Sequence, residues 1–190
     1  MLSHRVHTCA CAWCRQRPLR RNLKKISVNS VVSVANNNVG VCMQIEIRKV
    51  TSAEKDAWFQ MRKGVWPEAT DDYLLFDMDE VLASDIDLIF MAFVNDKPAG
   101  MLEASIREYA EGCETSPVGY IEAWFVDGEF RKTGVAGELV RAAENWAKEK
   151  GCTEMGSDTW LDNEASIRAH EKLGYKEVDR LVHFVKQLEA

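Results

Sequence analysis

The first 42 residues of this chain contain no aspartate and no glutamate, although the whole chain has 30 acidic residues. They carry seven of its 24 lysines and arginines, so residues 43–190 combine 17 basic with 30 acidic side chains, a net charge of −13. An acidic domain disfavours nucleic acid, whose phosphates repel carboxylates. It suits a cationic small molecule, because a surplus of carboxylates attracts cations.

Long apolar runs are also missing. No stretch approaches the eighteen or more residues of a membrane-spanning helix, so we expect no membrane partner. Cysteine is scarce beyond residue 42, where only Cys113 and Cys152 occur, too few for a disulfide framework. With 46% hydrophobic residues, the composition predicts a globular protein in the reducing cytoplasm.

The N-terminal segment holds the other cysteines. Cys9, Cys11 and Cys14, with His4 and His7, offer metal-ligating side chains. Structural zinc sites normally add a second spaced ligand pair, which is missing here. The sequence therefore predicts no metal site.

Residues 1–42 differ in composition from the rest. An acid-free start containing arginine and serine is typical of transit peptides. We prefer another interpretation, in which 1–42 is a basic extension, disordered or upstream of the natural start. At Met43 the alternation of a first strand begins abruptly. The predicted catalytic domain is 43–190.

The domain is predicted to be α/β, with a mixed central sheet, flanking helices and the element order βααβββαβαββ. Thr51 and Glu54 form a capping-box pattern at the start of the first helix. A second helix is expected from about Thr70. The later elements are strands at 86–94, 99–107, 120–126 and 152–158, helices at 134–150 and from about 163 to 173, and a final strand pair within 176–188.

A glycine-rich loop follows the strand 120–126. Free N–H groups at a helix start carry partial positive charge and bind phosphate, and Arg131 and Lys132 add full charges. An ordinary helix start is the alternative. The residues predicted to bind a cofactor's phosphates are Lys132, Thr133, Gly134, Val135, Ala136 and Gly137.

The pattern Arg131-x-x-Gly134-x-Ala136 after a strand, with Leu-Gly-Tyr175 ending a helix some forty residues later, resembles the GCN5-related N-acetyltransferases (GNAT). Further segments are similar to the aminoglycoside 6′-N-acetyltransferases, in particular their short-chain, homodimeric bacterial branch. These segments are Met101–Arg107, Glu114–Gly119, Ser157–Asp158, Leu161–Asn163 and Trp66. The resemblance covers 43–190 and none of 1–42.

The resemblance implies direct acetyl transfer from acetyl-CoA, in a ternary complex, to the 6′-amine of an aminoglycoside, which confers antibiotic resistance. It implies that main-chain N–H groups of Trp124, Phe125 and Val126 bind the cofactor and polarise the thioester carbonyl. Asn163 matches a cofactor-contacting asparagine, and it can also be a plain helix cap.

The acceptor amine must lose a proton, for which a carboxylate is the natural base. The candidates are Glu103, Glu114, Glu122 and Asp158. Glu122 interrupts an apolar strand, where a charge is costly unless it faces a cleft. Asp158 ends the neighbouring strand, where ligands of open α/β sheets bind. We predict Glu122 and Asp158 as catalytic, although strand alternation also allows Glu122 to face outward.

Substrate contacts are likewise implied by the resemblance. Glu122 and Asp158 would contact the drug, together with Trp66, Tyr109 and Asp179. The aromatic pair offers flat faces to sugars and cations. Trp66 can instead belong to the core, and Asp179 can be a solvated turn charge or reach the site of a partner subunit.

His170 stands where many GNAT enzymes have a tyrosine that protonates the leaving thiolate. The histidine can donate this proton, contact the cofactor or serve packing, and water can replace it. Two other functions stay open: a GNAT enzyme for another cationic amine, such as a polyamine, peptide or small metabolite, and a non-enzymatic cofactor-binding module. Turnover distinguishes them, since the module would bind acetyl-CoA without releasing thiol.

Overall fold

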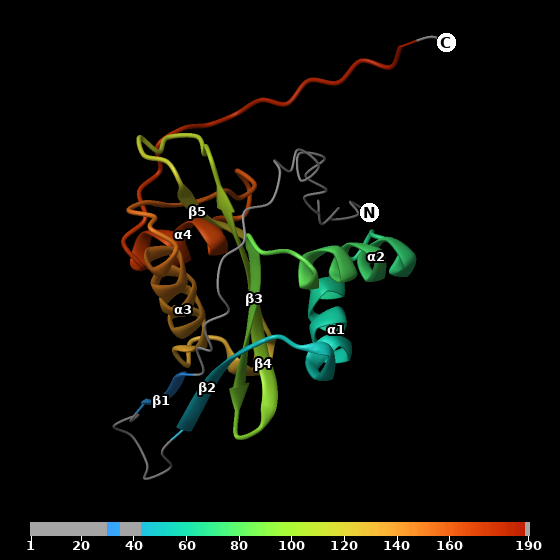
Figure 1. Ribbon diagram of the computed structural model, residues 1–190, viewed down its shortest axis with the longest axis vertical. Helices are drawn as coiled ribbons and strands as arrows, with labels where there is room; N and C mark the ends of the chain where they lie inside the picture. The colour runs from blue at the N-terminus through green and yellow to red at the C-terminus, as the bar shows by residue number, and fades with distance from the viewer. Residues whose placement is uncertain (1–29, 35–42, 189–190) are drawn as a thin grey trace, which may run out of the picture.

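The computed structural model describes residues 30–34 and 43–188, in which a central sheet carries helices on both faces (Figure 1). The sheet has six strands in the spatial order β1 to β6. Neighbours are antiparallel except for β5 and β6, which run parallel. The strands are β1 (Ser30–Val34), β2 (Met43–Lys49), β3 (Asp87–Val94), β4 (Lys97–Arg107), β5 (Val118–Val126) and β6 (Met155–Ser157).

The helices cover the sheet in two pairs. One face carries α1 (Lys55–Val65) and α2 (Asp71–Leu82), and the other carries α3 (Val135–Glu149) and α4 (Glu164–Lys172) (Figure 1). Two 3₁₀ turns, η1 (Ser52–Glu54) and η2 (Gly128–Phe130), precede α1 and α3. Each face has its own apolar core. The α/β class with a mixed sheet is therefore confirmed.

Local sequence signals account for the helix starts. Thr51 and Glu54 form the predicted capping box: the Thr51 side chain accepts from Ala53 N–H, and Glu54 accepts from Thr51 N–H at 2.9 Å. Apolar residues at helical spacing along α3 are buried against the sheet: Val135, Leu139, Val140, Ala143 and Trp146. The α3 helix ends at Gly151, whose φ of 89° is left-handed.

The N-terminal edge of the sheet differs from the prediction. Ser30–Val34 pairs with Met43–Lys49 in an antiparallel register and adds an edge strand that the sequence pattern did not reveal. The other residues of 1–42, including the Cys9–Cys14 motif, lie outside the described residues. The domain boundary at Met43 stays a prediction.

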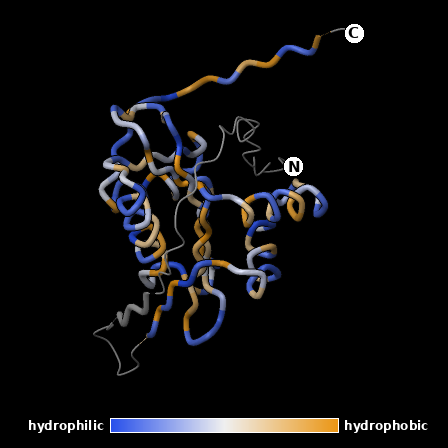
Figure 2. Tube along the Cα trace, in the orientation of Figure 1, coloured by the Kyte–Doolittle hydropathy of each residue, from blue (hydrophilic) through white to orange (hydrophobic). Residues whose placement is uncertain are grey.

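The predicted final strand pair is wrong. Residues 176–188, here called the C-terminal arm, have no secondary structure and run away from the domain (Figure 1). The alternating sequence favours a strand, but a strand also needs a neighbour for its N–H and C=O groups. Hydrophobic and hydrophilic residues follow one another along the arm (Figure 2). The apolar ones are exposed, Phe184 by 92% and Val185 by 97%. In the described part of the chain, no helix is long and apolar enough to cross a bilayer.

Candidate active site

The strands β5 and β6 separate after a short parallel pairing. The pairing ends at Ile121 opposite Ser157, and the next residues along the two strands are Glu122 and Asp158. We call this point of separation the fork. On its other side β5 pairs with β4, where Ala104 lies opposite Ile121 and Glu103 lies opposite Ala123. Glu122 is thus the extra residue of a β-bulge, a feature that bends a strand and redirects a side chain.

The Glu122 carboxylate lies on the side of the sheet that carries α1, and three donors hold it. Arg107 donates from Nε to Oε1 at 2.9 Å and from Nη2 to Oε2 at 2.6 Å, and the Ser105 hydroxyl donates to Oε1 as well. The side chains of Glu122 and Arg107 are 21% and 29% exposed. Glu122 is therefore a partly desolvated, ordered carboxylate, not a freely solvated one.

Asp158 lies across the fork and is held by a neutral donor. The Tyr120 hydroxyl donates to Asp158 Oδ1 at 2.8 Å. Burial first, and then the charge and hydrogen bond of Asp158, raise the pKa of Tyr120 well above its usual value. The hydroxyl therefore stays a donor. The Arg107 guanidinium stacks on the Tyr120 ring, 3.4 Å from its centroid.

The other two carboxylate candidates, Glu103 and Glu114, are not available as bases at the fork. Glu103 is buried, accepts from Trp58 Nε1 at 2.7 Å, and has Arg62 Nε 2.9 Å from Oε1. Burial raises the pKa of Glu103 to about 7, against the opposing effects of Arg62 and Trp58. Glu114 is exposed on the loop after β4, and its N–H donates to Glu154 at 2.8 Å.

The predicted substrate contacts are only partly brought together. Trp66 is half-buried just after α1, with the Arg62 guanidinium 4.9 Å from its ring centroid, so it belongs to the edge of the core. Tyr109, on the loop after β4, is 64% exposed. Asp179 lies on the C-terminal arm, where it accepts from Arg180 N–H, and makes no described contact with the fork.

The opposite face of the fork can hold a phosphorylated cofactor. Lys132 and Gly134 have left-handed φ angles of 65° and 99° just before α3. Gly134 has no side chain to cap the first N–H groups of the helix, and Lys132 is exposed beside it. Thr133 turns its hydroxyl inward, donating to the Phe130 carbonyl at 2.6 Å. The start of α3 therefore fits the pyrophosphate of acetyl-CoA.

The remaining predicted cofactor residues lie between this loop and the fork. Trp124, Phe125 and Val126 form the end of β5, which pairs with no strand on the β6 side beyond Ile121 among the described residues. The Val126 carbonyl accepts from Arg131 Nε at 3.1 Å, and the other main-chain groups on that side face no strand in this part of the chain. Asn163 caps α4, accepting from Ser166 N–H at 3.2 Å, so its predicted capping role is confirmed.

His170 lies at the fork on the α4 side. Its Nδ1 is 2.9 Å from the Ser166 carbonyl, which can only accept, so Nδ1 carries a proton. Its Nε2 is 2.9 Å from the Ser157 hydroxyl. Trp124 and Tyr175 pack edge-on against the ring, with centroids 5.4 and 5.5 Å away. The imidazole is thus fixed beside the last residue pair of the fork.

The sequence analysis missed three residues that donate to the carboxylates of Glu122 and Asp158: Ser105, Arg107 and Tyr120. A signal for the first two exists, because Glu103, Ser105 and Arg107 alternate along one face of a strand. Their pairing with Glu122 depends on the bulge, which local sequence does not reveal.

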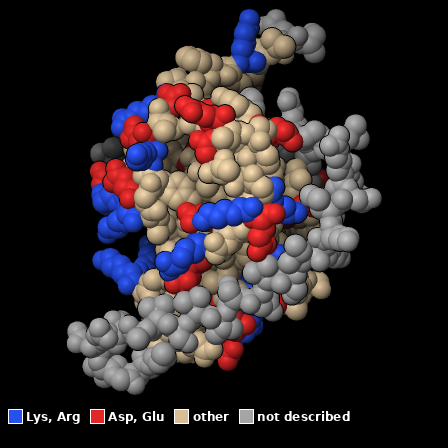
Figure 3. Space-filling view, turned by 60° about the vertical axis from the view of Figure 1, so that its left-hand side comes forward, with Lys and Arg blue, Asp and Glu red and all other residues tan. Residues whose placement is uncertain are grey.

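Charged side chains on the α3 side are mixed in sign (Figure 3).

A helix start suited to phosphate, a strand end without a partner strand in the described residues and a pair of carboxylates together fit an enzyme that transfers a group from a nucleotide-linked donor to a cationic acceptor. The sequence model of the acetyltransferase (GNAT) family matches residues 50–175. This chain therefore belongs to the GNAT family of acetyltransferases.

The relatives are more specific. Aminoglycoside N(6′)-acetyltransferase type 1 of Salmonella typhimurium is 38% identical over 144 residues, covering 75% of this chain and 99% of that protein. The protein of the same name from Acinetobacter haemolyticus is 38% identical over 146 residues, covering 76% and 100%.

Solved structures agree with this kinship. AAC(6′)-Iy bound to the bisubstrate analogue CoA-S-monomethyl-acetylneamine superposes with a TM-score of 0.73 at 37% identity, covering 76% of this chain and 99% of that one. Ligand-free AAC(6′)-Ig from Acinetobacter haemolyticus gives a TM-score of 0.72 at 38% identity, covering 75% and 99%.

Proposed function

We propose that this protein is an aminoglycoside 6′-N-acetyltransferase, which moves an acetyl group from acetyl-CoA to the 6′-amine of the drug in a ternary complex. The fork carries the proposal, because a phosphate-binding helix start lies on one side of it and two carboxylates lie on the other. The names of the relatives support the same substrate class. Acetylation removes a cation with which the drug binds RNA phosphates, and so causes resistance.

Acetyl-CoA would bind along β5 and the start of α3. Lys132 and the N–H groups of residues 134–137 would hold the pyrophosphate. Main-chain N–H groups of Trp124, Phe125 and Val126 would point donors at the thioester carbonyl. The bound co-substrate supplies an activated acetyl group.

The acceptor would enter from the α1 side of the sheet. Glu122 and Asp158 would hold the aminoglycoside beside the end of β5 and take up the proton that its amine loses. Trp66 and Tyr109 would flank the sugar rings with aromatic faces. The leaving thiolate would take its proton from water or from His170, which lies on the other side of the fork.

Thiol release tests the reaction directly. Purified protein with acetyl-CoA and either kanamycin or tobramycin should release free CoA in proportion to the drug consumed. Release with a polyamine or a peptide but with no 6′-amino aminoglycoside would replace this function by that of a GNAT enzyme for another amine. Tight acetyl-CoA binding without release to any amine would indicate a non-enzymatic module.

We further propose a homodimer in which the C-terminal arm of each subunit packs on the other. The outer edge of β6 has no strand beside it in the described residues, and a hollow of about 330 Å³ lies along this edge between Met155–Ser157 and the start of the arm. The arm has apolar side chains on both of its sides. Pairing of one copy's arm with the edge of another would cover both, and would carry Asp179 toward the partner's site.

Residues 43–190 are proposed to be the catalytic domain, since the family match lies entirely within them. Removing 1–42 takes away only β1 among the described elements, at the sheet edge opposite to β6. Turnover of the truncated protein should equal that of the full chain, and a dead truncation would refute this. We place the enzyme in the cytoplasm, where acetyl-CoA is available.

A further inference from the structure

The two carboxylates at the fork differ in what holds them. Glu122 is paired with a cation, because both of its oxygens accept from the Arg107 guanidinium. Asp158 accepts only from the neutral Tyr120 hydroxyl among the described residues. With Arg107 counted, the cluster has a net charge of −1, located at Asp158.

Arg107 also connects the two carboxylates mechanically. Its guanidinium stacks on the same Tyr120 ring whose hydroxyl donates to Asp158. A planar guanidinium can form a two-point bond to a carboxylate and stack on an aromatic face at the same time, which a lysine ammonium cannot do. Ser105 completes the arrangement by donating to Glu122 from the same strand as Arg107.

We propose that Arg107 is a specificity-determining positioning residue: it neutralises Glu122 and leaves Asp158 as the carboxylate that receives the substrate's ammonium group. This inference rests on the proposed function, since it concerns a cationic amine at the fork. An ammonium group at Asp158 brings the cluster to neutrality. A second uncompensated carboxylate would bind a polycation more tightly but would also hold its amine in the protonated, unreactive form.

The first test is Arg107→Gln, with equilibrium binding of tobramycin measured by calorimetry in the absence of acetyl-CoA. The variant exposes the charge of Glu122, so the Kd for tobramycin should fall about ten- to a hundredfold, by the usual size of one charge-assisted hydrogen bond. The kcat should fall about tenfold or more. An arginine that only supports the fold would instead raise the Kd and lower the kcat together.

The double variant Arg107→Gln/Glu122→Gln separates charge from packing. Removing both charges restores a net charge of −1 at Asp158, so the Kd should return to near the wild-type value if Arg107 acts through Glu122. Arg107→Lys retains the charge but loses the fork-shaped bond and the stacking. Its Kd should stay near that of the wild type, and its kcat should lie between those of the wild type and Arg107→Gln. This variant also tests the proposal if Arg107→Gln does not fold.

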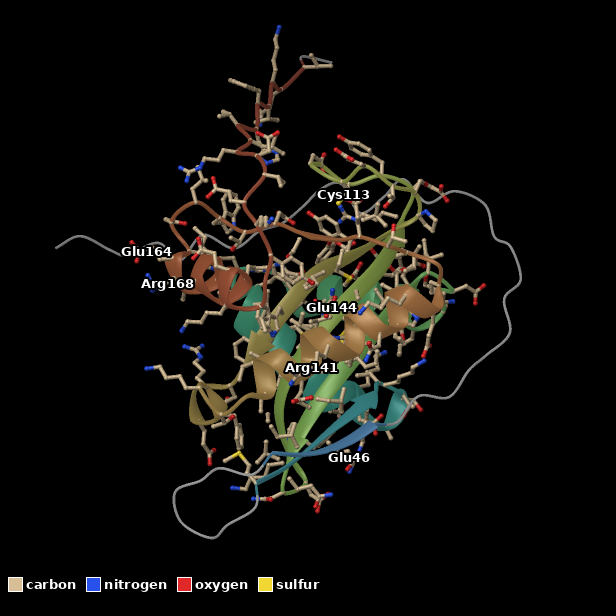
Figure 4. The ribbon with its side chains drawn as sticks, turned by 90° about the vertical axis from the view of Figure 1, so that its left-hand side faces the viewer. Glu46, Cys113, Arg141, Glu144, Glu164 and Arg168 are labelled. Atoms are coloured by element: carbon tan, nitrogen blue, oxygen red, sulfur yellow. The ribbon has the colours of Figure 1, made fainter. Side chains whose placement is uncertain are left out.

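Arg168→Gln provides the matched control. Arg168 pairs with Glu164 at 2.8 Å on α4, and both side chains are exposed and point away from the sheet (Figure 4), so its loss changes the net charge of the protein equally without removing a contact of Glu122 or Asp158. This variant should leave Kd and kcat unchanged. Weaker tobramycin binding in Arg107→Gln, or a double variant no closer to the wild type than the single one, would overturn the role of Arg107. Wild-type protein that neither binds nor acetylates any aminoglycoside would overturn the proposed function instead.

Discussion

At the scale of single residues, the account depends on Glu122 and Asp158. Each is the first residue beyond the last β5–β6 pair, and each is oriented by a donor from the α1 side of the sheet. The proposed cofactor loop is elsewhere, at the start of α3. Acceptor binding and cofactor binding can therefore be impaired separately by substitution.

Glu122→Gln and Asp158→Asn should each lower kcat/KM for tobramycin about a hundredfold or more, the usual range for loss of a positioned acid–base group. The Kd for acetyl-CoA should stay within twofold of the wild-type value. Steady-state thiol release gives the first quantity and calorimetry the second. Near-normal activity of both variants would show that the acidic face of the fork is not the acceptor site.

The buried Glu103 predicts a pH dependence of stability. Burial raises its pKa to about 7 from an ordinary value of 4.5, so between these values the folded state binds the proton more tightly than the unfolded chain does. The contribution of Glu103 to stability is full below about pH 4.5 and is lost as the pH rises through 7, a change of about 3 kcal/mol.

The Glu103→Gln variant keeps an acceptor for Trp58 but does not titrate. Urea unfolding at pH 5, 6.5 and 8 should therefore show the wild type losing stability relative to the variant as the pH rises. The comparison uses the slope of the free energy of unfolding against pH. Any loss of stability from the missing Arg62–Glu103 pair that is the same at every pH therefore cancels. Parallel curves, or a wild type that gains stability relative to the variant, would refute the assignment.

At the scale of elements, the helices and most strands could be predicted, because their signals are local. The capping box at Thr51, the helical spacing along α3 and the alternation along β4 depend on residues a few positions apart. The bulge at Glu122 could not be predicted, since it depends on the register between two strands. The residue type of Glu122 was informative, but its pairing with Arg107 was not visible.

The two ends of the sheet show the same limit. Alternation within 176–188 indicates strand propensity, yet the arm pairs with no strand in the part of the chain that the structure describes. Conversely, Ser30–Val34 forms a strand in a segment whose composition suggested disorder, because β2 offers it an edge. Whether a segment pairs depends on its neighbour as much as on its own residues.

The start of α3 can be tested as an element with its own internal control. Gly134 and Gly151 lie at the two ends of the helix, both with left-handed φ angles, and a Cβ at Gly151 would meet no atom within 4 Å. Alanine at either position should cost about 1 kcal/mol of stability through backbone strain. Only Gly134→Ala should weaken acetyl-CoA binding, by about tenfold, because only Gly134 adjoins the proposed phosphate site. Equal Kd values for the two variants would contradict the phosphate assignment.

At the scale of the whole molecule, the exposed C-terminal arm is the basis of the proposed dimer. Removing residues 177–190 should convert a dimer into a monomer, measured by light scattering after size exclusion. Phe184→Asp should weaken the dimer in the same direction, since a charge would replace an aromatic side chain that the proposed dimer buries. Gln187→Asp adds the same charge to the arm without removing an apolar side chain and should leave the dimer intact. A full-length protein that is monomeric would refute the proposed packing of each subunit's arm on the other.

The whole molecule also brings two chemistries to one point. The donor would approach the fork from the side of α3 and α4, and the acceptor from the side of α1 and α2, so that they meet where β5 and β6 separate. The sheet separates the phosphate-binding loop from the carboxylates. In the proposed reaction, the substrate would place a cationic primary amine at the fork.

The most direct measurement compares neomycin with paromomycin, which differ only in carrying an amine or a hydroxyl group at the 6′ carbon. With acetyl-CoA and the full chain, neomycin should give thiol release and a product with one added acetyl group by mass spectrometry, located at the 6′ nitrogen by NMR. Paromomycin should give release at least a hundredfold slower, because the fork is built to receive an ammonium group. Equal release with both drugs, or acetylation of neomycin at another nitrogen, would contradict the proposed 6′ specificity.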